Sequence, residues 1–322
     1  MKYLITGATG HIGNNLTRLL LGKNYQVKIL IRNPKDASIV DLTCEKVIGD
    51  ITSDEALESF FEDDAIVIHC AGMIDLTEKY LDQMLKINFE ATQKIVQACI
   101  KHKCKLIYLG SSDAIASTKH LISEPDGFLL DGLDNYYGIT KAMASDYVYK
   151  ALKQGLLKGT IICPSCVLGN NDVKGSTQGV AIYKQSKRKV GFVLKGHYNF
   201  VDVDMVSDGI LKASLKEELA PVYLFTGVDV NVKQLYEAIF KATDKKPHYI
   251  YIPMFLAYIG AFFAIPYYKL TKKKPVLTKV MLDTISLDVV FDNRLAISEL
   301  GFMPTDFDEL IAKTINWFKE RA

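Results

Sequence analysis

The chain begins with a short apolar segment that passes at once into a glycine-rich turn. Residues Met1–Ile5 have the pattern of a buried strand, Thr6–Gly13 (TGATGHIG) follow, and a leucine-rich helical pattern comes next. Gly7 permits a tight turn, Gly10 lets a ligand approach the backbone, and Gly13 allows the helix to pack closely on the strand. A strand, a glycine turn and a helix N-terminus in this order predict a site for the pyrophosphate of a dinucleotide.

Strand and helix patterns then alternate through the first half of the chain. Strands are expected at residues 27–31, 47–48, 65–69, 106–109 and 160–163, and helices at 53–61, 80–101 and 135–153. This alternation predicts parallel strands joined by helical crossovers, with helices on both faces of the sheet. We therefore expect an α/β fold with a doubly wound parallel sheet, which is a Rossmann fold.

The second half of the chain is less regular. Helical patterns occur at 204–215, 232–242, 294–301 and 306–320, while residues 170–179 are rich in Asn, Gly, Ser and Thr and predict a loop. We expect residues 1–165 to form the dinucleotide-binding domain. Residues 166–322 are expected to form mainly a smaller substrate-binding lobe, with some segments returning to the Rossmann sheet.

The overall composition excludes several classes of protein. The 322 residues carry a net charge of +2, which is too small to indicate a basic surface that binds nucleic acid. Six scattered cysteines favour reduced thiols in the cytoplasm over a disulfide framework, and no metal site is expected. Cys163 and Cys166 have the spacing of a redox pair, but Cys163 ends an apolar run and is interpreted as a buried strand end. No signal peptide is expected, because the first residues already belong to a strand.

Residues 249–268 contain no charged side chain, and Lys272–Lys274 follow. Pro253 and Pro266 leave an uninterrupted helix of about 18 Å between them, too short for a membrane core of about 30 Å, so no transmembrane span is expected. We expect a buried helix that forms a wall for an apolar substrate. A dimer face and a peripheral membrane contact through 249–274 are the alternatives.

The residues that follow the second and third strands bear on the choice of cofactor. A carboxylate after the second strand would bind the ribose hydroxyls of NAD, whereas an arginine can hold the 2′-phosphate of NADP. The chain has Arg32 there and no acid, so we expect NADP, with NAD as the alternative. Asp50, followed by Ile51, is expected to reach the adenine amine, and the small residues Cys70–Gly72 let the backbone approach the cofactor.

Ser112, Tyr137 and Lys141 form the candidate catalytic set. Tyr137 and Lys141 lie four residues apart on one helix face, so the ammonium is expected to lower the pKa of the phenol toward the range useful for proton transfer. Lys141 can also reach a ribose hydroxyl. Ser112 follows the fifth strand, where its hydroxyl can polarise a substrate carbonyl. Tyr136 and Ser111 compete for these roles, but Tyr136 has no cation four residues on.

These residues resemble those of the extended short-chain dehydrogenases/reductases of the NAD(P)-dependent epimerase/dehydratase type. The resemblance covers nearly the whole chain. The motifs that carry it are TGATGHIG at 6–13, GD at 49–50, HCAG at 69–72, INFEAT at 87–92, GSS at 110–112, YGITK at 137–141, PSCVLG at 164–169, NFVDVDMV at 199–206 and the C-terminal LGFMPTDFDELIAKTINWF.

The resemblance implies roles for individual residues. Ser112, Tyr137 and Lys141 would be the catalytic triad, Pro164–Val167 would line the nicotinamide, and Asn88 matches a structural position. Together with the expectations above, the cofactor-binding residues are Gly7, Gly10, His11, Ile12, Gly13, Arg32, Asp50, Ile51, Cys70, Ala71, Gly72, Tyr137, Lys141, Pro164, Cys166 and Val167. Two helices of the Rossmann half often form a dimer interface in this family, so a homodimer is implied.

Within the family, residues 196–204 are similar to dihydroflavonol-reductase-like and 3β-hydroxysteroid-dehydrogenase-like members. They lack the arginine that sugar-nucleotide epimerases and dehydratases usually carry ahead of this element. Two departures from the family pattern stand out: Met205 replaces the usual second acid, and Cys163 replaces an arginine often found before the proline.

The expected function is that of an NAD(P)-dependent oxidoreductase. It would transfer a hydride between NADP(H) and a carbonyl or alcohol group of a fairly apolar small molecule, such as an aldehyde, a ketone or a sterol-like compound. One alternative is an NAD-dependent sugar-nucleotide epimerase or dehydratase. The other is a non-catalytic protein that senses NADP(H), which is disfavoured because Tyr137 and Lys141 are both present.

Overall fold

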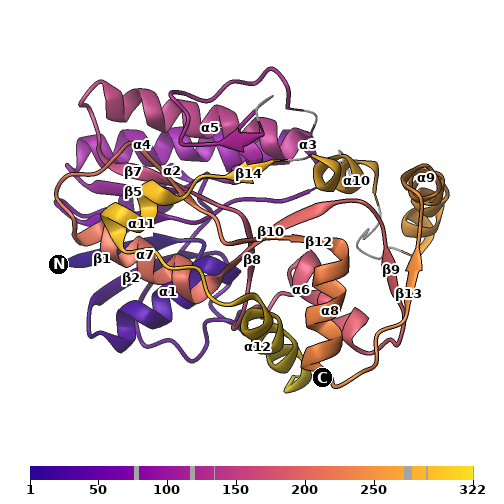
Figure 1. The fold of residues 1–322 in the computed structure, drawn as a ribbon. Helices are drawn as coiled ribbons and strands as arrows, with labels where there is room; N and C mark the ends of the chain where they lie inside the picture. Colours follow the sequence, from indigo (N-terminus) through magenta and orange to yellow (C-terminus); the bar gives the residue numbers. More distant parts are fainter. Residues whose placement is uncertain (76–79, 117–119, 134, 272–277, 288, 322) are drawn as a thin grey trace.

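A seven-stranded parallel sheet forms the centre of the molecule (Figure 1). The computed structural model describes residues 1–322 except 76–79, 117–119, 134, 272–277, 288 and 322. The strands, in spatial order, are β11 (Val222–Phe225), β7 (Lys158–Pro164), β5 (Lys105–Leu109), β4 (Ile66–His69), β1 (Lys2–Thr6), β2 (Gln26–Ile31) and β3 (Glu45–Ile48). The order reverses beside β1, as in a doubly wound sheet, which confirms the predicted fold class.

Helices cover both faces of this sheet because successive side chains of each strand point to opposite faces. Leu4 packs into one core, whereas its neighbours Tyr3 and Ile5 pack into the other. The first core is covered by α2 (Asp54–Phe60), α4 (Ala91–Lys101) and α5 (Tyr136–Lys153), and the second by α1 (His11–Gly22), α7 (Val203–Leu215) and α11 (Arg294–Leu300).

The predicted helix at 80–101 is not regular. It consists of α3 (Leu81–Met84), a π-helical turn η1 (Leu85–Glu90) and α4. The buried Asn88 lies in the π-helical turn, where its side chain bonds both backbone groups of Met73, at 2.7 and 2.9 Å, and the hydroxyl of Thr140 at 3.1 Å. These bonds tie the segment after β4 to α5, in agreement with a structural role for Asn88.

The smaller lobe has its own hydrophobic core, built around Phe200 and Ile311. Its elements are β8 (Cys166–Leu168), β10 (His197–Asp202), β12 (Val228–Asn231), α6 (Thr177–Ser186), α8 (Val232–Ala242) and α12 (Phe307–Lys319). The predicted loop at 170–179 ends earlier than expected, because the Ser176 side chain accepts a hydrogen bond from Gly179 N at 3.1 Å and starts α6.

The remaining elements complete the fold. They are η2 (Ser112–Ala114), β6 (Leu121–Ile122), β9 (Gly191–Val193), β13 (Tyr249–Tyr251), α9 (Met254–Thr271), α10 (Lys279–Ser286) and β14 (Val290–Phe291). Strand β11, which the sequence patterns did not predict, pairs with β7 at the edge of the central sheet. The domain boundary after residue 165 stays a prediction.

The expectation that residues 249–268 form a buried wall is wrong for one face of α9. Ala257 and Ala261 are buried, but Phe262 and Phe263 are each 70% exposed. The helix also continues past Pro266 to Thr271. Among the helices that the structure describes, none has both the length and the apolar character needed to cross a membrane.

Candidate functional site

The candidate site lies at the carboxyl edge of the central sheet, where β1, β4, β5 and β7 end side by side. The glycine turn after β1 is tightly packed there. Gly7 has φ +77°, and a Cβ at this residue would lie 2.6 Å from the backbone N of Ala71. A Cβ on Gly13 would lie 2.3 Å from the carbonyl oxygen of Gly7. A side chain at residue 7 would therefore push the turn away from the segment after β4, and one at residue 13 would push α1 away from the turn.

The N-terminus of α1 fits a dinucleotide pyrophosphate. Its N-cap residue is Gly10, no side chain caps the helix, and the first turn holds no acidic residue. A Cβ on Gly10 would meet only the Gly7 carbonyl oxygen, at 3.3 Å, so this side of the turn is open. The backbone N–H groups of the first turn, which begins with His11 and Ile12, are therefore available to phosphate oxygens.

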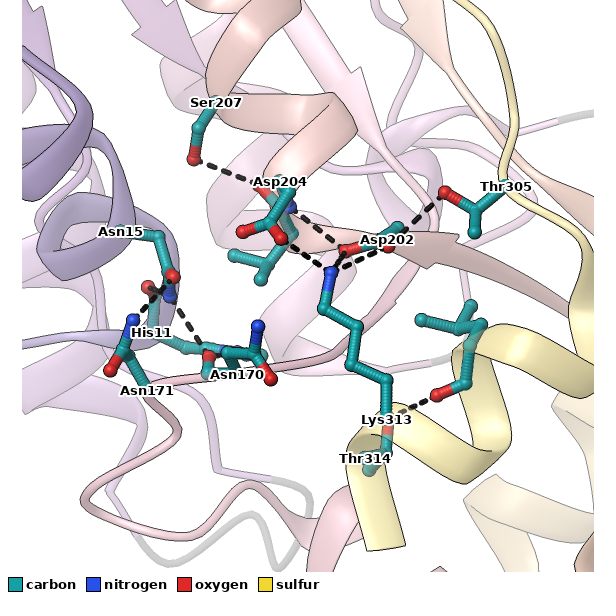
Figure 2. Close-up of polar contacts among 12 residues, drawn as sticks. His11, Asn15, Asn170, Asn171, Asp202, Asp204, Ser207, Thr305, Lys313 and Thr314 are labelled. Atoms are coloured by element: carbon teal, nitrogen blue, oxygen red, sulfur yellow. Dashed lines mark hydrogen bonds and ion pairs between the residues drawn. The ribbon is translucent and has the colours of Figure 1, made fainter. Parts of the chain in front are cut away.

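His11 contributes position rather than charge. Its Nε2 lies 2.7 Å from the carbonyl oxygen of Asn170, in the loop after β8 (Figure 2). Burial lowers the pKa of the imidazole, against the smaller opposing effect of nearby carboxylates such as Asp172. The ring is therefore neutral at pH 7 and joins the glycine turn to the smaller lobe.

One cation and one carboxylate lie where the second and third strands end. Arg32 has a side chain that is 71% exposed, and its Nη1 lies 4.0 Å from Oδ2 of Asp50. Burial raises the pKa of Asp50, but hydrogen bonds from the backbone and hydroxyl of Thr52 outweigh it, and the net shift is downward. Ile51 packs against the core beneath. The edge thus presents an exposed guanidinium beside an ionised carboxylate.

The segment after β4 approaches the glycine turn closely. Cys70 N donates to the carbonyl oxygen of Thr6 at 3.1 Å, Ala71 N lies 3.4 Å from the Thr6 hydroxyl, and Gly72 is exposed. His69, just before them, is fully buried, and burial together with the Lys141 charge lowers its pKa to about 3. His69 is therefore neutral and structural.

Tyr137 lies in the first turn of α5 and faces the end of β5. Burial and the carboxyl group of Asp113 raise the pKa of its phenol, while a hydrogen bond with the Ser111 hydroxyl acts in the opposite direction. The pKa was expected to be lowered by Lys141, and the structure corrects this. The Lys141 ammonium instead donates to Tyr108 Oη at 2.9 Å and to the Leu109 carbonyl oxygen at 2.5 Å.

Lys141 itself is almost completely buried. Burial lowers the pKa of its ammonium to about 8, and its Nζ lies 4.5 Å from the centre of the Tyr108 ring. At pH 7 the side chain therefore carries a charge that is held between the helix and the end of β5. The positive charge is held against Tyr108 and the Leu109 carbonyl oxygen.

The two serines after β5 differ in orientation. Ser111 is 7% exposed and accepts a hydrogen bond from Asp113 N at 3.2 Å, and its hydroxyl lowers the pKa of the nearby Tyr137 phenol. Ser112 is half-buried and begins η2. The structure thus places Ser111, the competing residue of the sequence analysis, next to Tyr137.

Asp113 was not predicted as a site residue. It is exposed to solvent, yet the surrounding protein raises the pKa of its carboxyl group. Its charge acts on both Tyr137 and Cys166. The signal in the sequence was its place directly after the two serines at the carboxyl edge of the sheet.

The segment from β7 to β8 forms the wall opposite α5. Pro164 is buried, whereas Cys166 and Val167 are half-buried. Cys163 and Cys166 are free thiols; burial raises the pKa of Cys163 to about 12 and that of Cys166 further still. Such thiols are poor nucleophiles. Within the part of the chain that the structure describes, no three His, Cys, Asp or Glu side chains are grouped as a metal site requires.

An ion-pair cluster joins α12 to the start of α7 (Figure 2). Both Asp202 carboxylate oxygens lie 2.8 Å from Lys313 Nζ, which also contacts Asp204. Asp202 is 2% exposed, caps α7 through Asp204 N at 2.9 Å, and accepts from Thr305 at 3.1 Å. This cluster anchors the C-terminal helix beside the loop that bonds His11.

Replacing Lys313 by methionine is expected to lower the free energy of unfolding by about 2–3 kcal/mol, because the buried Asp202 carboxylate would lose its cation. Urea denaturation would measure the change. The control is Lys241→Met, which breaks an exposed pair with Asp308 and should leave stability unchanged. Equal losses in the two variants would contradict a special contribution of Lys313.

Comparison with known proteins gives matches along the whole chain. The model of the NAD dependent epimerase/dehydratase family matches residues 3–224. The chain is 25% identical to sterol demethylase protein B of Methylococcus capsulatus, over 100% of this chain and 99% of that protein. It is 22% identical to a putative dihydroflavonol 4-reductase of Synechocystis, over 99% and 95% of the two chains.

A solved structure has the same fold. The crystal structure of gox2253 superposes with a TM-score of 0.84 at 22% sequence identity, covering 100% of this chain and 98% of that one. The likeness therefore extends beyond the Rossmann half to the smaller lobe.

Proposed function

Because the chain belongs to the NAD-dependent epimerase/dehydratase family, and so to the NAD(P)-dependent enzymes of the extended short-chain dehydrogenase/reductase type, we propose that it is an NADPH-dependent carbonyl reductase. The substrate would be a fairly apolar aldehyde, ketone or sterol-like compound. The observation that carries the proposal is the grouping of Tyr137 and Lys141 on α5 with the serines after β5 at the sheet edge, beside a helix N-terminus open to a pyrophosphate.

In this proposal NADPH, when bound, supplies the hydride that reaches the carbonyl carbon. Tyr137 gives its proton to the carbonyl oxygen, so an alcohol and NADP⁺ are formed and the phenolate regains a proton from solvent. Ser111, with Ser112 beside it, donates a hydrogen bond to the same oxygen. With its pKa raised, the Tyr137 phenol is protonated at neutral pH, as a proton donor in carbonyl reduction must be.

The remaining residues would hold the cofactor. The first turn of α1 would bind the pyrophosphate, Arg32 the 2′-phosphate, and the segment Pro164–Val167 would face the nicotinamide. Lys141 is a positioning residue for Tyr108 and the end of β5, and we propose that it also bonds a ribose hydroxyl.

Two named relatives support an apolar substrate. Sterol demethylase protein B and the putative dihydroflavonol 4-reductase both match over nearly their full length, and their names refer to a sterol and to a dihydroflavonol. A nucleotide-sugar substrate would need a cation for its diphosphate, and the segment 196–204 contains only Asp202 and Asp204 as charged groups besides His197.

The direct test is an assay of NADPH oxidation by the purified protein with a panel of aliphatic, aromatic and polycyclic ketones and aldehydes. Release of the nucleotide from denatured protein would be analysed in parallel. Oxidation of NADPH with formation of alcohol supports the proposal. Tightly bound NAD, recovered without any consumption of NADPH, would instead identify an epimerase or dehydratase.

Single alanine substitutions can separate the two serines. Ser111→Ala removes the hydroxyl near Tyr137 that is proposed to bond the substrate carbonyl, and it is expected to lower kcat by roughly 10-fold to 100-fold, a loss typical of one hydrogen-bond donor at a reacting oxygen. Ser112→Ala, the matched control, is expected to have the smaller effect. Steady-state kinetics would compare the two variants. A larger loss of kcat in Ser112→Ala would show that Ser112 donates the hydrogen bond to the carbonyl oxygen.

A further inference from the structure

Helix α9 exposes an unusual face. Its large apolar side chains Phe255, Leu256, Ile259, Phe262 and Phe263 are all exposed. Their spacing places them on one side of the helix. A surface helix of a globular protein normally turns such residues inward, so this face requires an explanation.

The opposite side of α9 carries small residues. Ala257 and Ala261 are buried against Leu282 and Ile285 of α10. The helix is therefore attached to the lobe through alanines, and its larger apolar surface is directed away from the protein. In Figure 1 α9 lies at the outer edge of the lobe, far from the central sheet.

The exposed apolar surface continues onto the two-stranded sheet at the base of the helix. Ile250 of β13 is paired in register with Phe192 of β9, and both are exposed. Tyr251 is 65% exposed. We refer to these residues together as the α9 face, which comprises Phe192, Ile250, Tyr251, Phe255, Leu256, Ile259, Phe262 and Phe263.

The stretch of sequence that contains α9 carries charges of one sign. No acidic residue occurs in the sequence between Asp244 and Asp283. The lysines of this stretch are Lys245, Lys246, Lys269, Lys272, Lys273, Lys274 and Lys279. Lys195 and Lys233 also line a depression beside Tyr251 at the base of α9. The nearby carboxylates of Glu237 and Asp283 are paired with Lys233 and Lys279, at 3.3 and 2.6 Å.

We propose that the α9 face docks onto an anionic lipid surface. Aromatic and aliphatic side chains at helical spacing would enter the boundary between headgroups and acyl chains, with α9 lying in the plane of the surface. The lysines that precede and follow the helix in the chain would attract anionic headgroups. Among possible occupants, a lipid surface is favoured because the segment joins a purely apolar face to an excess of positive charge.

The experiment is co-sedimentation of the full-length protein with vesicles. Phosphatidylcholine vesicles are compared with vesicles that also contain phosphatidylglycerol. The protein is expected to bind the anionic vesicles at low salt and to bind them less at high salt, because the lysine contribution is screened. The variant F262S/F263S is expected to lose at least roughly 10-fold in binding, since it removes two of the largest inserted side chains.

The control variant is L156S/L215S, which removes two exposed leucines outside the α9 face. It should bind like the unmodified protein. Thermal unfolding followed by circular dichroism would show whether both variants remain folded. The measurement needs neither cofactor nor substrate, so its result is independent of the proposed catalytic function.

Three results would overturn the proposal. One is failure of the unmodified protein to bind the anionic vesicles. Another is loss of the expected contrast, either because F262S/F263S still binds the anionic vesicles or because neutral vesicles bind the protein equally well. The last is a dimer in sedimentation velocity that F262S/F263S dissociates, without lipid binding, which would make the α9 face a subunit interface.

Discussion

Replacement of Tyr137 by phenylalanine is expected to lower kcat by roughly 10²-fold to 10⁴-fold, the usual contribution of a positioned proton donor. The ring would still pack between Ser111 and the end of β5, and only the hydroxyl would be lost. NADPH binding should persist, because the pyrophosphate and 2′-phosphate contacts assigned to α1 and Arg32 do not involve this hydroxyl. Steady-state kinetics and NADPH fluorescence titration would measure the two effects separately.

Tyr136→Phe is the matched control for this prediction. The two tyrosines are neighbours at the start of α5, and both are half-buried. Of the two, Tyr137 is the one whose pKa is shifted by Ser111 and Asp113. Turnover should therefore be nearly unchanged in Tyr136→Phe. Full activity in Tyr137→Phe would contradict the assignment of Tyr137 as the proton donor. A large loss of NADPH affinity would show that the residue binds the cofactor instead.

The second large effect is expected from Arg32→Asp. A charged hydrogen bond to the 2′-phosphate contributes roughly 1.5–3 kcal/mol, and the new carboxylate would repel the phosphate as well. The kcat/KM for NADPH should fall roughly 10²-fold to 10³-fold relative to that for NADH. The fold should tolerate the change, because the Arg32 side chain is exposed and makes only a 4.0 Å ion pair with Asp50.

Lys35→Asp provides a control of the same charge change in the same loop. Lys35 is exposed, three residues beyond Arg32. A general repulsion of NADPH by the added negative charge would lower the relative kcat/KM for NADPH in both variants. Loss of a specific contact with the 2′-phosphate would lower it only in Arg32→Asp. If the unmodified protein already prefers NADH, or if Arg32→Asp leaves the ratio unchanged, the assignment of NADP is wrong.

Features that depend on neighbouring residues were predicted well. The strand, glycine turn and helix at the N-terminus need only the apolar pattern of residues 1–5 and the glycines at 7, 10 and 13, and all are found. Ser53 and Asn135 cap α2 and α5 as short-range hydrogen bonding requires. The parallel sheet followed from alternation of strands and helices along the chain.

The missed features involve contacts between distant segments. Strand β11 is a short apolar segment that could be assigned as a strand only from its pairing with β7, some sixty residues earlier. The choice between Ser111 and Ser112 depends on which hydroxyl the turn after β5 directs at α5. The pKa of Tyr137 depends on burial and on Asp113, and the Lys141 ammonium is drawn to Tyr108 and Leu109 instead.

The sequence alone determined the fold class, the glycine turn ahead of α1 and the helix that carries Tyr137 and Lys141, because periodicity and short-range turn geometry act within a few residues. Only the tertiary structure decided which serine meets Tyr137, where Asp113 lies and which side of α9 is exposed. The apolar residues 249–268 illustrate the reason. The hydrophobicity of a segment predicts that its side chains will be buried, but it does not predict which side chains contact the rest of the protein. In the structure the alanines of α9 pack against α10, and the phenylalanines are exposed.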